Sequence, residues 1–178
     1  MKKNLLLSLL CVFTLGCSSG DDSSTKEESE ETEFIGGVLE GGILLRTQKE
    51  VDEFAAKGYT GITASLFLTG VLTTGNAVFD PIKDISALNT LTFIGADIRI
   101  SRTELTALTG LENLTSIGGD IFVCICPTGD DACQICGSLI TDFCAIRAAL
   151  TNSSDTSIQI RGLFTPSVED IIGGNCSL

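Results

Sequence analysis

The sequence predicts an α+β solenoid, a short stack of parallel β-strands with a helical cap at each end. Two observations lead to this prediction. The stretch LTFIGADIRI at 91–100 returns as LTSIGGDIFV at 114–123, a step of 23 residues. The ends of the folded part carry helical patterns in place of this repeat. A period in the twenties is typical of solenoids in which each turn adds a strand to a parallel stack.

The match extends to the residues before the two stretches: aligned at a step of 23 residues, the chain has apolar residues at seven matching positions without a gap. The pairs are Ile82 and Leu105, Ile85 and Leu108, Leu88 and Leu111, Leu91 and Leu114, Ile94 and Ile117, Ile98 and Ile121, and Ile100 and Val123. Gly95 also matches Gly118, and Asp97 matches Asp120. Because one turn of a repeat cannot bury its apolar side alone, we interpret the repetition as a packing device rather than as a repeated active site.

More diverged copies flank this pair. Residues 66–68 fall at the place of 98–100, and residues 158–160 repeat the pattern once more. The steps between the starts of these strands are 32, 23 and 37 residues. The longest step contains the cysteine-rich segment 124–138, which we interpret as an insertion on a regular frame.

The N-terminal end of the folded part predicts a strand and then a helix. The strand is GGILLRT at 41–47. Thr47 and Glu50 form a capping-box pattern at the start of the helix, and Gly58 is placed as its C-cap.

The C-terminal end predicts two more helices. In the first, 139–150, one face carries Leu139, Phe143, Ile146 and Leu150. The second begins at Pro166, with Thr165 as its N-cap, and stops at Gly173 and Gly174. An open strand stack needs such caps, because its end strands otherwise expose apolar side chains and unpaired backbone groups.

Residues 1–16 have the pattern of a lipoprotein signal peptide. Lys2 and Lys3 precede an apolar run that is about half the roughly 20 residues of a spanning helix. The run ends in Leu15-Gly16-Cys17, which resembles the bacterial lipobox. That resemblance implies a mature chain that begins at an acylated Cys17, carrying chains such as palmitate and anchored in a membrane. The alternative is a plain signal peptide with a chance cysteine.

Residues 17–33 predict a disordered tether behind the lipidated cysteine. The stretch after Cys17 holds seven acids, one lysine and no large apolar residue, so it cannot offset the entropy of ordering. By the sorting rule known for Gram-negative lipoproteins, Ser18 favours the outer membrane. The acidic stretch also resembles surface-export signals, so we expect a cell-surface location; a solvated spacer is the simpler interpretation.

The composition excludes several classes of function. Eleven lysines and arginines against 23 acids give a net charge of −12, which argues against nucleic acid as a partner. The chain has no histidine, which removes Ser-His-Asp and Cys-His catalysis and every histidine–metal site. No catalytic constellation or phosphate-binding loop stands out. We therefore expect a protein that is not an enzyme and has no cofactor or metal.

Six cysteines remain after the signal peptide and the lipidated residue. An even count in an exported chain favours disulfides. They are Cys124, Cys126, Cys133, Cys136, Cys144 and Cys176. Of the 15 pairings that six cysteines allow, we favour Cys144 with Cys176 and two local bridges among the other four.

Other roles for the cysteine-rich segment stay open. The spacing C-x-C-x6-C-x2-C offers four thiolates to zinc, and Cys126 alone could stay reduced and buried. The CxxC at 133–136 could be a redox motif, but it lacks a thioredoxin-like context. Asp130 and Asp131 could bind calcium, although adjacent acids in a loop are usually solvated.

Taken together, residues 41–176 resemble receptor L-domain-type leucine-rich repeat proteins of bacterial surface lipoproteins. The segments that carry the resemblance are RTQKEVDEFAAKGYTGI, DPIKDISALNTLTFIGADIRI, LTALTGLENLTSIGGDIFV and LFTPSVEDIIGGNC. The resemblance implies a leucine-rich-repeat, L-domain-like domain over residues 34–178, and it does not indicate a ligand.

The candidate ligand-binding face is the outer side of the predicted strand stack, because alternate strand residues face outward. It carries Ser65, Phe67, Asp97, Arg99, Asp120, Phe122 and Gln159. Phe67 and Phe122, with Arg99 between them, are residue types that anchor interfaces, and aromatic rings also stack on sugars. The alternative is that a loop or helix covers the phenylalanines. The loop at 127–138 is a second candidate surface.

These features predict a non-catalytic binding module for protein or glycan, which acts in adhesion or recognition at the cell surface. The alternative is a structural or accessory lipoprotein of the periplasm that binds no external ligand. An enzyme is the third hypothesis, for which the sequence offers no particular pair of carboxylates.

Overall fold

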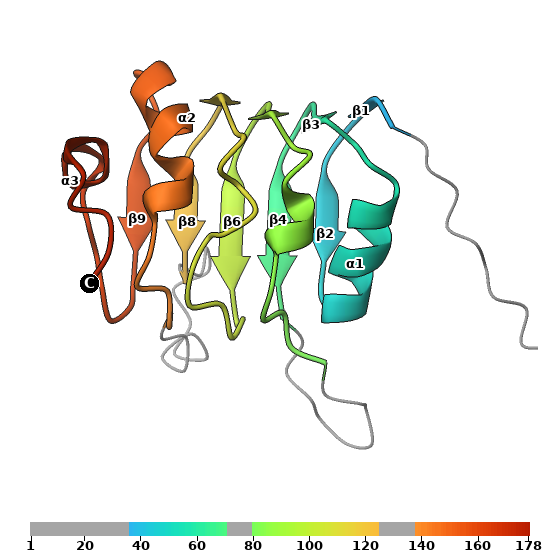
Figure 1. Ribbon diagram of the computed structural model, residues 1–178, viewed down its shortest axis with the longest axis horizontal. Helices are drawn as coiled ribbons and strands as arrows, with labels where there is room; N and C mark the ends of the chain where they lie inside the picture. The colour runs from blue at the N-terminus through green and yellow to red at the C-terminus, as the bar shows by residue number, and fades with distance from the viewer. Residues whose placement is uncertain (1–35, 71–79, 125–137) are drawn as a thin grey trace, which may run out of the picture. The chain divides into compact units, whose positions relative to one another are not determined.

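The computed structural model describes residues 36–70, 80–124 and 138–178 (Figure 1). All of them belong to the second of the two units into which the chain divides, Glu31–Leu178. They form two parallel β-sheets, one of four and one of five strands, with few helices. The first and last strands of each sheet are not neighbours, so neither sheet closes into a barrel.

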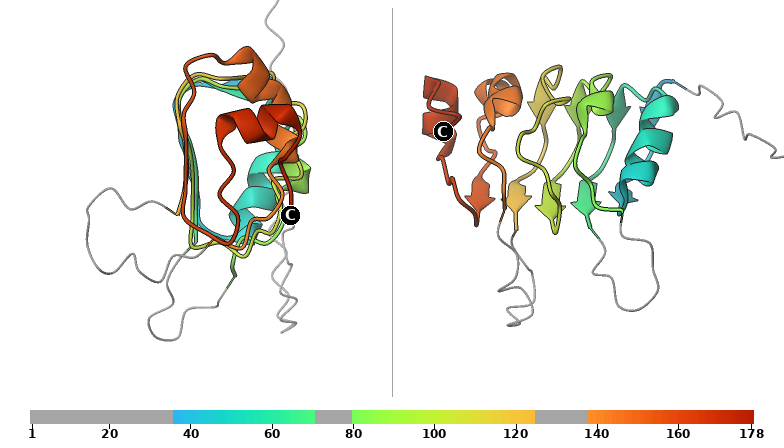
Figure 2. Two further views of the ribbon diagram at one scale, coloured as in Figure 1. Left: turned by 90° about the vertical axis from the view of Figure 1, so that its left-hand side faces the viewer. Right: turned by 60° about the horizontal axis from the view of Figure 1, so that its bottom comes forward.

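The chain alternates between the two sheets until its last strand, which joins the same sheet as the strand before it. The four-stranded sheet contains β1 (Val38–Leu39), β3 (Gly61–Ile62), β5 (Phe93–Ile94) and β7 (Ser116–Ile117) in that order. The five-stranded sheet contains β2 (Ile43–Leu45), β4 (Leu66–Thr69), β6 (Ile98–Ser101), β8 (Ile121–Val123) and β9 (Ile158–Ile160). The left view of Figure 2 shows successive passes of the chain lying one behind another.

The register of the five-stranded sheet confirms the alignment made from the sequence. Leu66 pairs with Ile98, Ile98 with Ile121, and Ile121 with Ile158, all in parallel. The predicted strand within 41–47 is β2, which pairs with β4. The repeated sequence thus determines which residues lie side by side on neighbouring strands.

The core is built largely from the aligned apolar pairs, which come from the strands and from the segments between them. All seven pairs are buried, and Ile117, the most exposed of them, has an exposed fraction of only 3%. Burying an Ile or Leu side chain stabilises the fold by about 1.5–3 kcal/mol. The repeated apolar positions therefore supply a large part of the stability.

Helix α1 (Gln48–Ala56) follows β2 as predicted, with one difference at its start. Thr47 accepts a hydrogen bond from the Glu50 backbone N–H (3.1 Å). The Glu50 carboxylate accepts from the Arg46 N–H, one residue before the position that a capping box requires. At the other end Lys57 is the C-cap, and Gly58 follows with a φ of +67°.

The helix predicted for 139–150 is wrong in its first half. The structure begins with a 3-10 turn, η3 (Cys144–Ile146), followed by α2 (Arg147–Asn152), and Leu139 is 45% exposed. The residues before the turn pair with neighbouring backbone instead: the Thr141 N–H donates to the Thr106 carbonyl oxygen (2.9 Å). This tertiary pairing overrides the local helical pattern.

The last helix, α3 (Val168–Gly173), ends where predicted but begins later than predicted. Its N-cap is Ser167, not Thr165. Ser167 and Asp170 form a reciprocal capping box, in which each side chain accepts a hydrogen bond from the other's backbone N–H. Gly174 ends the helix with a φ of +94°.

The helical segments follow the order of the strands. Helix α1 contacts η1 (Ser86–Leu88), and α2 contacts α3. Figure 1 shows α1 beside β2 at one end of the sheets, and α3 next to β9 at the other. None of the helices in the described ranges has the length and apolar character that a membrane-spanning helix needs.

Candidate functional site: the outer face of the five-stranded sheet

One row of outward-facing residues crosses all five strands of the larger sheet. Leu44, Phe67, Arg99, Phe122 and Gln159 are partners in register on neighbouring strands. Leu44 is 40% exposed and Gln159 is exposed, while the three central residues are half-buried. We call these five residues the aromatic–arginine row.

Arg99 joins the two phenylalanines of the row. Its guanidinium carbon lies 4.6 Å from the centroid of the Phe122 ring and 5.9 Å from that of Phe67. Both distances fall within the range in which a cation is attracted to an aromatic face. The structure therefore brings together the three residues that the sequence placed side by side.

Asp97 holds Arg99 in this position. Its Oδ2 accepts hydrogen bonds from Nη2 of Arg99 at 2.9 Å and from Nε at 3.3 Å. The hydrogen bond from Arg99 is the main reason why the pKa of Asp97 lies below its ordinary value; the Asp120 backbone N–H acts in the same direction. Burial opposes this shift only in part. Asp97 is therefore a carboxylate at neutral pH, and the ion pair persists there.

A second row of residues, two positions before the aromatic–arginine row on each strand, has a structural role. The Asp97 N–H donates to Ser65 Oγ (3.3 Å), and the Asp120 N–H donates to Asp97 Oδ1 (3.0 Å). Asp120 Oδ1 then accepts from the backbone N–H (2.9 Å) and hydroxyl (2.8 Å) of Ser157. We call Ser65, Asp97, Asp120 and Ser157 the polar ladder.

The polar ladder changes how two predicted ligand-binding residues are understood. Asp97 and Asp120 were expected to meet a ligand, but each uses a carboxylate oxygen to fasten the next pass of the chain. Ser157, which the sequence analysis missed, completes the ladder. Asp97 and Asp120 lie 23 residues apart, which is the length of the repeat. This match of two polar residues was the signal in the sequence from which the ladder could have been predicted.

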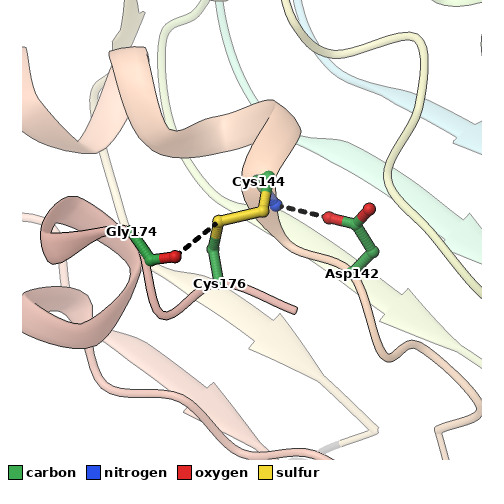
Figure 3. Close-up of a disulfide and its surroundings, with 4 residues drawn as sticks. All are labelled: Asp142, Cys144, Gly174 and Cys176. Atoms are coloured by element: carbon green, nitrogen blue, oxygen red, sulfur yellow. Dashed lines mark hydrogen bonds between the residues drawn. A yellow bond between two sulfur atoms is a disulfide. The ribbon is translucent and has the colours of Figure 1, made fainter. Parts of the chain in front are cut away.

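The predicted disulfide between Cys144 and Cys176 is present, with the Cα atoms 5.0 Å apart (Figure 3). It ties the start of η3 to the chain segment that follows α3. The Cys144 N–H also donates to Asp142 Oδ1 (2.8 Å). Cys124 is disulfide-bonded as well.

Several predicted residues lie outside the described part of the chain. They are Cys17, Cys126, Asp130, Asp131, Cys133 and Cys136, together with the signal peptide 1–16, the tether 17–33 and most of the loop 127–138. Among the described residues, no group of three or more Cys, Asp or Glu side chains is placed to hold a metal ion.

An open depression of about 460 Å³ lies beside α2. Its lining residues are Glu112, Cys144, Ala145, Arg147, Ala148, Thr151 and Asn152. Glu112 is the one carboxylate of this lining, whereas acid–base hydrolysis of a glycosidic bond uses a pair. The aromatic–arginine row is therefore the stronger candidate site.

The domain therefore consists of two parallel sheets, and the larger sheet carries an outward-facing row with aromatic and arginine side chains at its centre. Comparison with known protein families, with curated proteins and with solved structures gives no significant match. The functional assignment accordingly rests on the sequence and on the geometry of this face.

Proposed function

We propose that this protein is an outer-membrane lipoprotein whose folded domain is a non-catalytic binding module for protein or glycan at the cell surface. The domain is a receptor L-domain-like, leucine-rich-repeat solenoid in this proposal. The parallel register carried from β2 to β9 supports the solenoid. The positions of α1 and α3 at the two ends support their role as caps.

The observation that supports binding is the fixed arrangement of Phe67, Arg99 and Phe122 on the outer sheet face. Aromatic and arginine side chains are the types that most often dominate binding energy. Here the sheet register and the Asp97 ion pair hold them in place before any ligand arrives. Because these side chains are already ordered, less binding free energy is spent on immobilising them when a ligand binds.

The N-terminal segment supplies the attachment in this proposal. Acyl chains on Cys17 hold the protein in the outer membrane, and the acidic stretch to residue 33 is the tether. Seventeen residues span up to about 60 Å when fully extended. That length gives the sheet face access to molecules well beyond the membrane surface.

The Phe122→Ala variant tests the binding function. Purified full-length protein is first screened on arrays of glycans and matrix proteins, and the ligand that binds most tightly is chosen. We expect Phe122→Ala to weaken the binding of that ligand. The loss expected for a central aromatic anchor is about 2 kcal/mol, or roughly thirtyfold in Kd. The measurement is the Kd of that ligand for each variant.

The matched control is Val38→Ala, which truncates a side chain that is 41% exposed on the four-stranded sheet. This control should bind like the wild type. Circular dichroism and the thermal midpoint confirm that each variant is folded, and Phe67→Ala provides a second test of the row. Unchanged binding by both phenylalanine variants would exclude this face as the site.

A further inference from the structure

The arginines of this acidic chain gather on the five-stranded sheet. Four of the five arginines lie in its strands or directly after them: Arg46 after β2, Arg99 in β6, Arg102 after β6, and Arg161 after β9. The described lysines that form ion pairs lie elsewhere: Lys49 pairs with Glu53, and Lys83 with Glu104. Although the chain has a net charge of −12, most of its arginines lie along this sheet.

Three of these arginines lie on alternate strands of the sheet. Arg46 is the next outward-facing position after Leu44, and Arg161 is the next after Gln159, by the alternation of strand residues. With Arg99 between them they mark the first, third and fifth strands. Alternate strands lie about 10 Å apart, and Arg46 and Arg161 lie two residues, or about 7 Å, further along their strands than Arg99. The backbone positions of Arg46, Arg99 and Arg161 therefore form a zigzag with steps of about 12 Å.

The two outer arginines are available to a ligand. Within the described ranges, Arg46 and Arg161 are exposed and neither forms an ion pair. Arg99 is paired with Asp97. Asp120, the other acid of this face, is engaged by Ser157. The positive charge at the two edges of the sheet therefore has no internal partner among these residues.

We infer that this face binds a linear acidic polysaccharide that runs across the strands. Its carboxylate or sulfate groups pair with Arg46 and Arg161, because a guanidinium recognises such planar or multi-oxygen anions with two parallel hydrogen bonds. Another anion meets the part of the Arg99 guanidinium that Asp97 does not bind. The apolar faces of its sugar rings rest on Phe67 and Phe122. This inference rests on the proposed function and specifies its ligand.

The regular spacing favours a polysaccharide over an acidic protein. A linear polysaccharide with a charged repeating unit presents its anions at a constant interval, just as the arginines recur on every second strand. An acidic protein surface presents its carboxylates at irregular intervals. The row is also open at both edges, where Leu44 and Gln159 are exposed, so a chain can extend past it.

The test compares full-length wild-type protein with the double variant Arg46→Gln/Arg161→Gln. The probes are polygalacturonate, which carries carboxylates, and dextran sulfate, which carries sulfates. Unsulfated dextran is the neutral probe and polyglutamate is the acidic polypeptide. We expect binding to one or both acidic glycans, a loss of about tenfold or more in Kd for the double variant, and weaker wild-type binding as salt rises.

The matched control is Arg147→Gln, which removes the same charge from α2, outside the sheet. It should bind within about twofold of the wild type, well under the tenfold that 1.4 kcal/mol represents. No binding to either acidic glycan, equal binding to neutral dextran, or preference for polyglutamate would overturn the inference. If the inference fails but Phe122→Ala still weakens the binding of another ligand, the proposed function stands. If neither Phe122→Ala nor Arg46→Gln/Arg161→Gln changes the binding of any ligand, the inference and the proposed function are both wrong.

Discussion

The Gly118→Ala variant is expected to lose about 3 kcal/mol of its free energy of unfolding, the upper part of the range for adding an atom where the surrounding structure leaves no space. A Cβ atom at Gly118 would lie 2.2 Å from the carbonyl oxygen of Gly95. A Cβ at Gly95 would in turn lie 2.2 Å from the carbonyl oxygen of Thr63. Backbone cannot move aside as a flexible side chain can, so successive passes of the chain would have to separate.

Gly173→Ala is the matched control for this prediction. Gly173 is the last residue of α3, and a Cβ there would meet nothing within 4 Å. Its stability should be unchanged or higher by up to about 1 kcal/mol, because alanine restricts the unfolded chain. Urea unfolding of the three proteins gives the comparison. A Gly118→Ala variant as stable as the wild type would contradict the close approach of the passes.

Removing the disulfide between Cys144 and Cys176 should cost about 3–4 kcal/mol, the value expected for a loop of this length. The two residues are 32 positions apart. The bond holds the C-terminal tail against η3, where the Phe143 N–H donates to the Cys176 carbonyl oxygen (2.8 Å). Phe143 itself is fully buried beside this contact.

The variant to use is Cys144→Ser/Cys176→Ser, because a single substitution would leave a free thiol. Its thermal midpoint should fall well below that of the oxidised wild type. Reductant should then lower the midpoint of the wild type by more than that of the double variant, since the variant has already lost this disulfide and keeps the one formed by Cys124. Equal midpoints for the double variant and the oxidised wild type would show that the tail is held by other contacts.

The sequence predicted the register of the five-stranded sheet, because the repeat itself determines it, but it predicted a single strand stack and missed the four-stranded sheet. Once residues 91–100 are aligned with 114–123, alternation decides which side chains face inward, and the core follows. The C-terminal helices were harder to predict. Leu139 fits a helical stripe, yet its segment pairs with backbone far away in sequence, and no local pattern reports that contact. The Ser167 cap was within reach, since Asp170 stands three residues on.

The candidate face was predictable only in part. Register alone placed Arg99 between the two phenylalanines, and the structure adds the Asp97 ion pair that orients it. The polar ladder depends on side-chain rotamers, which a single sequence does not specify. The sequence did contain one indication of the ladder, since Asp97 and Asp120 occupy the same position of the repeat. Thr92 and Thr115 match in the same way, and the Thr115 hydroxyl donates to the Thr92 carbonyl oxygen (2.9 Å).

The central claim is that this domain acts outside the cell, and protease shaving of intact cells tests it most directly. Cells that produce the protein are treated with a protease that cannot cross the outer membrane and are then blotted for the domain. We predict that the domain is lost while a periplasmic control protein stays intact. Protection of the domain to the same degree as the control would contradict the claim and would place the protein in the periplasm, as an accessory of the envelope.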